Sequence, residues 1–144
     1  MNVANTIVRG FNTLRVFQNE PTVTIVNAID TWDLPANYEY DDATDTIRHT
    51  STGAVLNNYS SYWDTTDVDM LPLETGEELR TLIMAGIVKE GSLDVLIVPA
   101  DKTVVQNGFR ALIGTEQYNI ASISQFPKGA VTDILYQVRL ERRA

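Results

Sequence analysis

The fold is decided by the stretch near the end of the chain, Ile134-Leu135-Tyr136-Gln137-Val138-Arg139-Leu140-Glu141-Arg142. Apolar and polar residues alternate along it, so one face carries Ile134, Tyr136, Val138 and Leu140. A second alternating stretch, Tyr118-Asn119-Ile120-Ala121-Ser122-Ile123-Ser124, precedes it. A period of two is typical of strands that are buried on one side only. Both stretches are therefore predicted to be strands of an antiparallel sheet.

Turn signals divide the rest of the second half into short segments. Residues 93–99 read as a strand, and turns are expected at 106–108, 114–116 and 127–129. The apolar run at 81–88 is expected to pair with 93–99 in a hairpin, with a helix as the main alternative. We therefore predict a mainly β fold, a small antiparallel barrel or sandwich, in a single domain of 144 residues.

The first half has weaker signals. A helical apolar face at Val3, Ile7, Phe11 and Leu14 predicts a short N-terminal helix or arm within residues 1–20. Residues 22–28 follow a proline and are rich in β-branched side chains, which predicts a strand. We expect a long loop at 30–53, with a small hairpin as the alternative, a strand at 54–63 and a loop at 64–72.

The net charge of −8 is unevenly distributed along the chain. Residues 28–78 contain twelve acids and one base, Arg48, whereas residues 79–144 carry a small positive charge. We therefore expect an acidic, loop-rich insertion at 30–78 beside a β core at 79–144. Because tight nucleic-acid binding depends on neutralising phosphates, this surface argues against gripping DNA. The same acidic surface would suit the wall of a channel through which DNA moves without being held.

The motifs of catalytic and metal sites are weak. The chain has no cysteine and one histidine, His49, and it lacks the Gly-x-Ser-x-Gly elbow of many hydrolases. The glycine-containing segment 86–92 lacks the Gly-Lys-Ser/Thr ending of a phosphate loop. Residues 64–69 match a calcium loop only loosely, and the Asp45–His49 spacing has meaning only on a helix. We predict a protein that is not an enzyme, with no cofactor or metal site, although a cation screening the acids in an oligomer stays open.

Two groups of residues are candidates for contacts between subunits. Tryptophan favours interfaces as well as cores, which directs attention to Trp32 and Trp63 in the acidic half. Near the C-terminus, a basic cluster is expected either to be a solvated strand end or to meet the acidic half of a neighbouring subunit. This cluster consists of Arg139, Arg142 and Arg143.

The order of these segments resembles phage head–tail stopper proteins, also called head-closure or head-completion proteins. The resemblance covers about half of the chain and rests on the segments 7–11, 23–25, 73–80, 96–100, 105–114, 117–123 and 129–142. The strand at 118–123 looks like the family's tyrosine-x-isoleucine strand, and 129–142 looks like its final strand. Gly108-Phe109 departs from the Gly-Asp pair that is common in the family.

The resemblance implies a homo-oligomeric, hexameric ring in the virion, at the head–tail junction, made in the host cytoplasm without a membrane. The portal and adaptor would lie above the ring and a tail protein below it. A loop from each subunit would close the channel after packaging, and double-stranded DNA would pass without sequence-specific binding. The candidate plug loops are 30–53 and 64–78, with the carboxylates Asp41, Asp42, Asp45, Asp64, Asp67 and Asp69.

Two alternatives remain open at the level of sequence. A tail-terminator or tail-tube protein also builds β-rich rings. A monomeric β-barrel module that binds a small ligand or sugar would use Trp32, Trp63 and nearby tyrosines to line a cleft.

Overall fold

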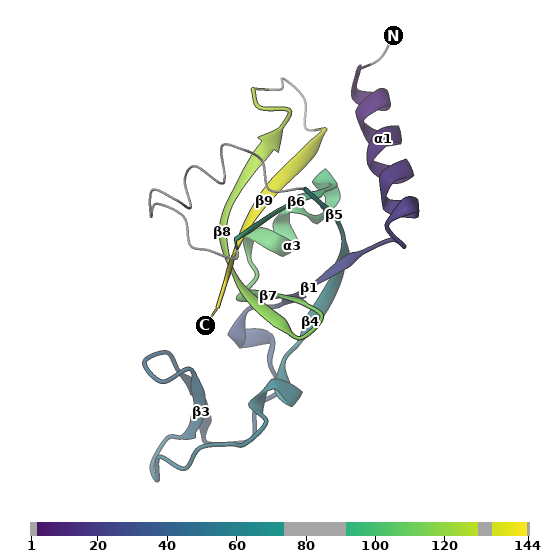
Figure 1. Ribbon diagram of the computed structural model, residues 1–144. Helices are drawn as coiled ribbons and strands as arrows, with labels where there is room; N and C mark the ends of the chain where they lie inside the picture. Colours follow the sequence, from purple (N-terminus) through teal and green to yellow (C-terminus); the bar gives the residue numbers. More distant parts are fainter. Residues whose placement is uncertain (1–2, 74–91, 130–133, 144) are drawn as a thin grey trace.

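The computed structural model describes residues 3–73, 92–129 and 134–143, and within them the chain forms one large and one small antiparallel sheet (Figure 1). The large sheet has seven strands in the order β4-β1-β7-β8-β9-β6-β5. Its strands are β1 (Thr22–Val26), β4 (Thr65–Asp69), β5 (Leu71–Pro72), β6 (Leu93–Ile97), β7 (Arg110–Ile113), β8 (Glu116–Phe126) and β9 (Leu135–Arg142). The small sheet is a hairpin of β2 (Tyr38–Asp41) and β3 (Thr46–His49). The helices are α1 (Val3–Phe17) and α3 (Lys102–Gln106).

The two outer strands of the large sheet are consecutive in the chain. Only Met70 separates β4 at one edge from β5 at the other, so the sheet curls round until its edges meet at this buried residue. In the described residues β4 and β5 do not pair with each other, and the sheet is not closed into a barrel. The predicted mainly β, antiparallel fold with an N-terminal helix is confirmed, and the open, curled sheet fits the sandwich-like alternative.

The main core lies inside the curl of the sheet. The face predicted for the last strand is confirmed, because Tyr136, Val138 and Leu140 are buried there. The other buried members of this cluster are Val23, Ile25, Val68, Met70, Val95, Ile97, Val105 and Ala111. Since neighbouring strands bring their inward residues together, the alternation of 134–142 and 118–124 determines which side of the sheet becomes the interior.

Helix α1 packs against the outside of the sheet through Phe11, which is 3% exposed and contacts Leu71, Leu96 and Leu135. The predicted helical face is only partly right, because Leu14 is half-exposed and Arg15 is buried in its place. The Arg15 guanidinium donates to the Met70 carbonyl at 3.1 Å and the Pro21 carbonyl at 3.0 Å, and pairs with Asp69 at 3.1 Å. These partners offset the cost of burying a charge, which periodicity alone does not take into account.

Two expectations for the first half need correction, and a third is met. The strand predicted at 54–63 is wrong, since this stretch holds a 3-10 turn, η2 (Tyr59–Tyr62), and one isolated bridge, Arg48–Val55. The loop predicted at 64–72 is wrong where β4 and β5 lie. Strand β4 buries only Val68 and exposes acids, as edge strands often do, so its composition is that of a loop. At 30–53 the hairpin alternative is the observed one.

Elsewhere the second half follows expectation, with one addition. The strand predicted at 93–99 is β6, and the turns at 114–116 and 127–129 separate strands as expected. The short helix α3 was not predicted. The predicted segment 81–88 and most of the loop portion 73–78 lie outside the described residues. No helix among the described residues combines the length and apolar character that a membrane span requires.

Gly108, between α3 and β7, permits the closest approach of backbone to core. A Cβ atom there would lie 2.5 Å from Cγ2 of the buried Ile25 and 3.2 Å from the Val105 carbonyl oxygen. We expect Gly108→Ala to lower the free energy of unfolding by about 1–3 kcal/mol, because overpacking forces the core to shift. Urea denaturation measures this change. Gly10→Ala is the control, since a Cβ on this glycine of α1 meets nothing within 4 Å, and it should stabilise slightly. Equal effects of the two substitutions would contradict the prediction.

Candidate functional site

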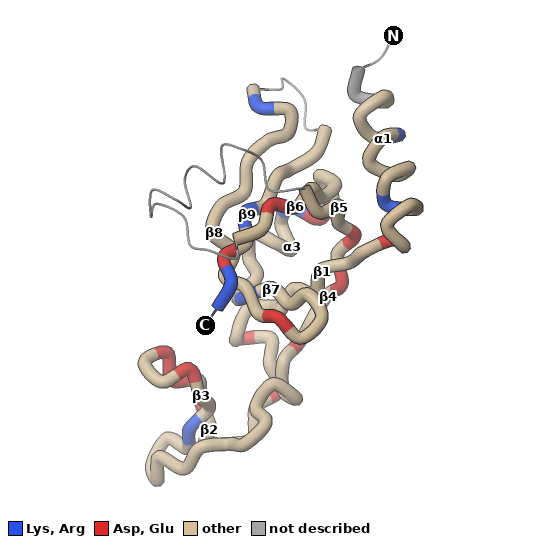
Figure 2. Tube along the Cα trace, in the orientation of Figure 1, with Lys and Arg blue, Asp and Glu red and all other residues tan. Residues whose placement is uncertain are grey.

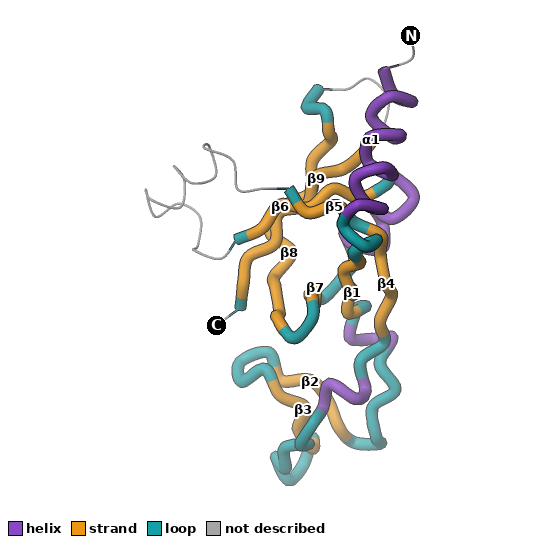
Figure 3. The backbone as a smooth tube through the Cα atoms, turned by 45° about the vertical axis from the view of Figure 1, so that its right-hand side comes forward, coloured by secondary structure: helices purple, strands orange, loops and turns teal. Residues whose placement is uncertain are grey.

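The hairpin β2–β3 lies beside the large sheet and is called the arm below (Figure 3). An aromatic cluster joins its strands to the large sheet. Trp32 packs edge-on against Phe109 at 5.4 Å and Tyr40 at 6.0 Å between ring centroids, and Ile47 of β3 is fully buried. The indole of Trp32 donates to the Asn27 carbonyl at 3.0 Å. The arm therefore has a small core of its own that continues into the sheet.

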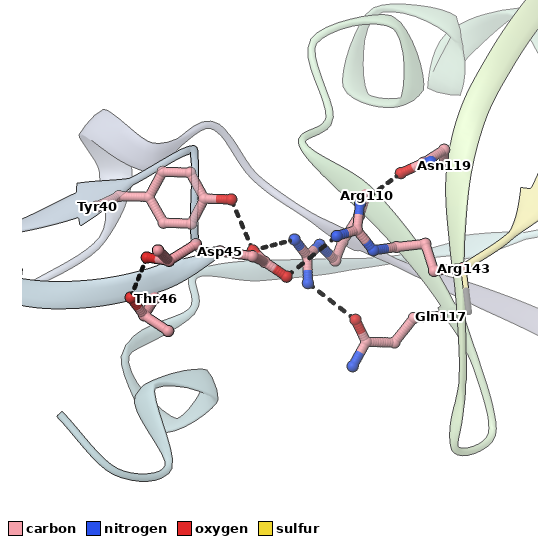
Figure 4. A network of polar contacts seen from close by, with 8 residues as sticks. Tyr40, Asp45, Thr46, Arg110, Gln117, Asn119 and Arg143 are labelled. Carbon is pink, nitrogen blue, oxygen red and sulfur yellow. Dashed lines mark hydrogen bonds and ion pairs between the residues drawn. The ribbon is translucent and has the colours of Figure 1, made fainter. Parts of the chain in front are cut away.

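A carboxylate at the turn of the arm is the centre of a polar network (Figure 4). Asp45 accepts hydrogen bonds from the Tyr40 hydroxyl at 2.6 Å, from Arg110 at 2.7 Å and from Arg143 at 3.0 Å. Tyr40 belongs to the arm, whereas Arg110 and Arg143 belong to the large sheet and the residues after it. Asp45 thus bonds to two arginines that lie 65 and 98 residues after it in the sequence.

The turn between β2 and β3 places this carboxylate. Asp45 has a positive φ of 51°, which aspartate tolerates better than most residues. The Asp41 side chain accepts hydrogen bonds from the Ala43 amide at 3.0 Å and the Thr44 hydroxyl at 2.9 Å. Such local side-chain bonds stabilise turns rich in Asp and Thr. The acids of this segment therefore shape the turn as well as charging it.

Arg110 is the buried member of the network, with 1% of its surface exposed. It donates to Gln117 at 2.8 Å and stacks on the Phe109 ring, with its guanidinium carbon 4.7 Å from the centroid. It also lies 5.5 Å from the centroid of Trp63. Within the described part of the chain, neither Nε of Arg110 nor Nε1 of Trp63 finds a hydrogen-bond acceptor. The charge of Arg110 therefore depends on Asp45, since a buried cation needs a counter-ion.

The C-terminal arginines have acidic partners within the same chain. Arg139 pairs with Asp94 at 3.0 Å, Arg142 with Glu116 at 2.8 Å and Arg143 with Asp45 at 3.0 Å. The predicted attraction between the basic end and the acidic half thus occurs inside one subunit for Arg143. A role of the three arginines between subunits stays a prediction. Trp32 is buried and Trp63 is half-buried, so both contribute mainly to the aromatic cluster.

The six candidate plug carboxylates fall into two separate groups, visible as red segments in Figure 2. Asp41, Asp42 and Asp45 lie at the turn of the arm. Of the other three, Asp67 and Asp69 lie on the edge strand β4, and Asp64 lies in the loop just before it. Each of these three has a partner: Asp64 accepts from Asn27 at 3.0 Å, Asp67 from Thr24 at 2.7 Å, and Asp69 pairs with Arg15. The choice between the two candidate plug loops stays a prediction, because residues 74–78 lie outside the described part of the chain.

The network shifts the pKa values of its own members. Burial acts to raise the pKa of Asp45, but hydrogen bonds from Tyr40 and Arg110 and the charges of Arg110 and Arg143 outweigh it, so this pKa falls below its ordinary 3.8. Burial and the hydrogen bond to Asp45 raise the pKa of Tyr40. Both shifts favour the ordinary charge states near neutral pH, an ionised Asp45 and a neutral Tyr40.

The lowered pKa of Asp45 predicts acid-sensitive stability. A carboxylate whose folded pKa lies below its unfolded value contributes stability that is complete above pH 3.8 and is lost as pH falls from there through the folded pKa. We expect Asp45→Asn to remove this part of the acid limb, as measured by urea denaturation between pH 2.5 and 6. Asp101 acts in the opposite direction, because burial and the charge of Asp69 raise its pKa. Asp101 is present in the unsubstituted protein and in Asp45→Asn, so its contribution cancels when their free energies of unfolding are subtracted. If the two proteins lost stability in parallel as the pH falls, the prediction would be wrong.

Sequence reasoning missed Tyr40, Arg110 and Gln117 as members of this site. The available signal was Arg110 itself, a cation at the start of the otherwise apolar strand Arg110-Ala111-Leu112-Ile113. His49, the one histidine, accepts hydrogen bonds through Nδ1 from the Ser51 and Thr52 amides and stacks on Tyr38. It therefore stabilises the end of the arm, as a structural residue does.

The surface near the network has a polar hollow of about 310 Å³, lined by Asp45, Tyr59, Thr115, Glu116, Gln117 and Arg143. Its charged members already pair with one another or with neighbours. Among the described residues, no group of three or more histidine or acidic side chains is arranged to hold a metal ion. No family model, curated protein or solved structure matches the chain. The interpretation of the site therefore rests on its own geometry.

Proposed function

We propose that this protein is a non-enzymatic structural subunit of a phage neck, of the head–tail stopper kind, that works in a homo-oligomeric ring. The observation that carries the proposal is the acidic arm β2–β3, which lies beside the curled sheet and is held to it at its turn through Asp45 (Figures 1 and 2). A ring of such arms provides closing elements at a pore, and the curled sheet provides the wall.

The charge of the arm suits a channel for DNA. Residues 38–49 contain four acids and one arginine, and Glu39 and Asp42 are exposed. Carboxylates disfavour adhesion to phosphates, so DNA would pass without being held. The aromatic cluster holds the strands of the arm against the large sheet, and the Asp45 network holds its turn there. Repulsion among neighbouring arms would act through the exposed carboxylates Glu39 and Asp42. This repulsion would oppose closure and keep the plug ready to open.

Locating the protein in assembled virions tests the proposal. We expect antibody labelling and cryo-electron microscopy to place it at the head–tail junction. Particles assembled without it should package DNA and then lose it. Labelling along or at the end of the tail would replace the stopper with a tail-tube or tail-terminator role. A monomer by light scattering that binds a sugar or small ligand would overturn the ring altogether.

A further inference from the structure

Asn107 and Gly108 lie in the turn between α3 and β7, and the pair has a chemistry of its own (Figure 1). Asn107 is the only asparagine of the chain that is followed by glycine. Because glycine has no Cβ, its amide nitrogen approaches neighbouring groups with little steric hindrance. The side chain of Asn107 is exposed, so water reaches it. Residue type and exposure therefore mark this pair as a site of spontaneous deamidation.

Deamidation at such a pair is an intramolecular reaction. The Gly108 amide nitrogen attacks Cγ of Asn107, a bond forms between these two atoms, the Cγ–Nδ2 bond breaks, and ammonia leaves with the amide proton. Water then opens the cyclic imide at one of its two carbonyls, which yields either aspartate or isoaspartate. In isoaspartate the main chain runs through Cβ and Cγ. The rate therefore depends on how closely the backbone brings the Gly108 nitrogen to Cγ.

The backbone conformation of Asn107 holds the reacting atoms apart. Its φ is −92° and its ψ is 0°, so the Gly108 nitrogen eclipses the backbone nitrogen of Asn107 about the Cα–C bond. Closure of the imide ring requires the Gly108 nitrogen to eclipse Cβ instead. Because substituents on a tetrahedral carbon are spaced by about 120°, ψ has to rotate by about a third of a turn before the ring can close.

Three backbone hydrogen bonds oppose this rotation. The successive amides of residues 107, 108 and 109 donate to the carbonyls of Thr103 at 3.0 Å, Val105 at 3.1 Å and Val26 at 2.7 Å. The second of these bonds also engages the proton that the reaction must remove. Gly108 has no room to shift inward, since a Cβ on it would lie 2.5 Å from Cγ2 of the buried Ile25. The folded turn is therefore fixed in a conformation that does not react.

We propose that Asn107 is a latent deamidation site, which the fold keeps closed and which reacts only when the turn between α3 and β7 opens locally. Native proteins undergo such local openings without unfolding as a whole. Isoaspartate adds one carbon to the main chain between the hydrogen-bonded residues, so the three bonds cannot all re-form. Each opening that ends in isoaspartate therefore leaves α3 less firmly held to β1. This inference concerns the turn alone and does not depend on the proposed function.

Peptide mapping by mass spectrometry measures how fast the full chain loses Asn107 at mildly alkaline pH, in buffer and in concentrated urea. We expect deamidation at Asn107 to be at least about tenfold faster in urea, because an opening free energy of only about 1.4 kcal/mol already gives a factor of ten. Isoaspartate should be among the products, detected by enzymatic methylation of the isoaspartyl carboxylate. Equal rates in buffer and in urea would overturn the inference.

Val105→Ala and Val138→Ala test whether the opening is local. Both valines belong to the main core and are 1% exposed, so the two substitutions remove the same buried methyl groups. Val105 lies on α3 beside the turn, whereas Val138 lies on β9. In buffer we expect Asn107 to react several-fold faster in Val105→Ala than in Val138→Ala, and at the same rate in urea, where the turn is absent. Equal rates in buffer would show that the reaction requires global unfolding and would overturn the local opening.

Discussion

Replacing Asp45 with asparagine is expected to lower the free energy of unfolding by about 3 kcal/mol at pH 7. Asparagine tolerates the positive φ of this position, so the substitution mainly removes the charge. Arg110 is then left buried without its counter-ion, and breaking a buried pair typically costs about 3–5 kcal/mol. The lower end applies because Gln117 still accepts from Arg110. Denaturation in urea or guanidinium measures the loss.

Asp41→Asn is the control for this prediction. Asp41 lies in the same turn and pairs with Arg48 at 3.3 Å, but both side chains are more than one-third exposed. An exposed pair contributes about 1 kcal/mol or less, so the control should change stability little. A double-mutant cycle with Arg110→Met adds a second check, because removing the buried cation should make the loss of Asp45 far less costly. Additive effects in the cycle would show that the two residues do not depend on each other.

Phe11→Ala is expected to lower the free energy of unfolding by about 3–4 kcal/mol. Phe11 holds α1 on the outer face of the sheet, in a cluster with Leu71, Leu96 and Leu135. Removing a buried phenyl ring loses its transfer free energy and leaves a cavity. Because the ring joins the helix to the sheet, we also expect faster amide hydrogen exchange along α1, measured by NMR or mass spectrometry.

Phe17→Ala provides the matched comparison on the same helix. Phe17 is mostly exposed, so its removal from an isolated subunit should change stability by less than about 0.5 kcal/mol. A large loss of stability for dilute Phe17→Ala protein, or a negligible loss for Phe11→Ala, would contradict this division between a core and a surface phenylalanine.

The sequence predicts the elements that depend on neighbouring residues better than those that depend on residues far apart in the chain. The alternation at 118–124 and 134–142 predicts β8 and β9 and the inward face of β9, because strand geometry alone relates neighbouring side chains. The edge strand β4 escapes prediction because it buries only Val68. Its strand conformation comes from pairing with β1, in which Val23 lies opposite Val68.

The candidate site shows the same dependence more strongly. The acidic segment and the basic C-terminus are plain in the sequence, which predicts that the arginines are either a solvated strand end or a contact to the acidic half of a neighbouring subunit. In the structure Arg143 reaches Asp45 of its own chain, because the curl of the sheet brings the residue after β9 close to the hairpin turn. The burial of Arg15 in place of Leu14 likewise depends on carbonyl groups supplied by the ends of other segments.

The sequence by itself determined the mainly β class, the positions of the C-terminal strands, the N-terminal helix and the acidic character of residues 28–78. These properties follow from local periodicity and composition. Only the tertiary structure decided that Asp45 holds the arm to the sheet, that β4 is an edge strand, and that Phe11 is buried whereas Phe17 of the same helix is exposed. Each of these depends on contacts between residues distant in the chain, which only the folded backbone brings together.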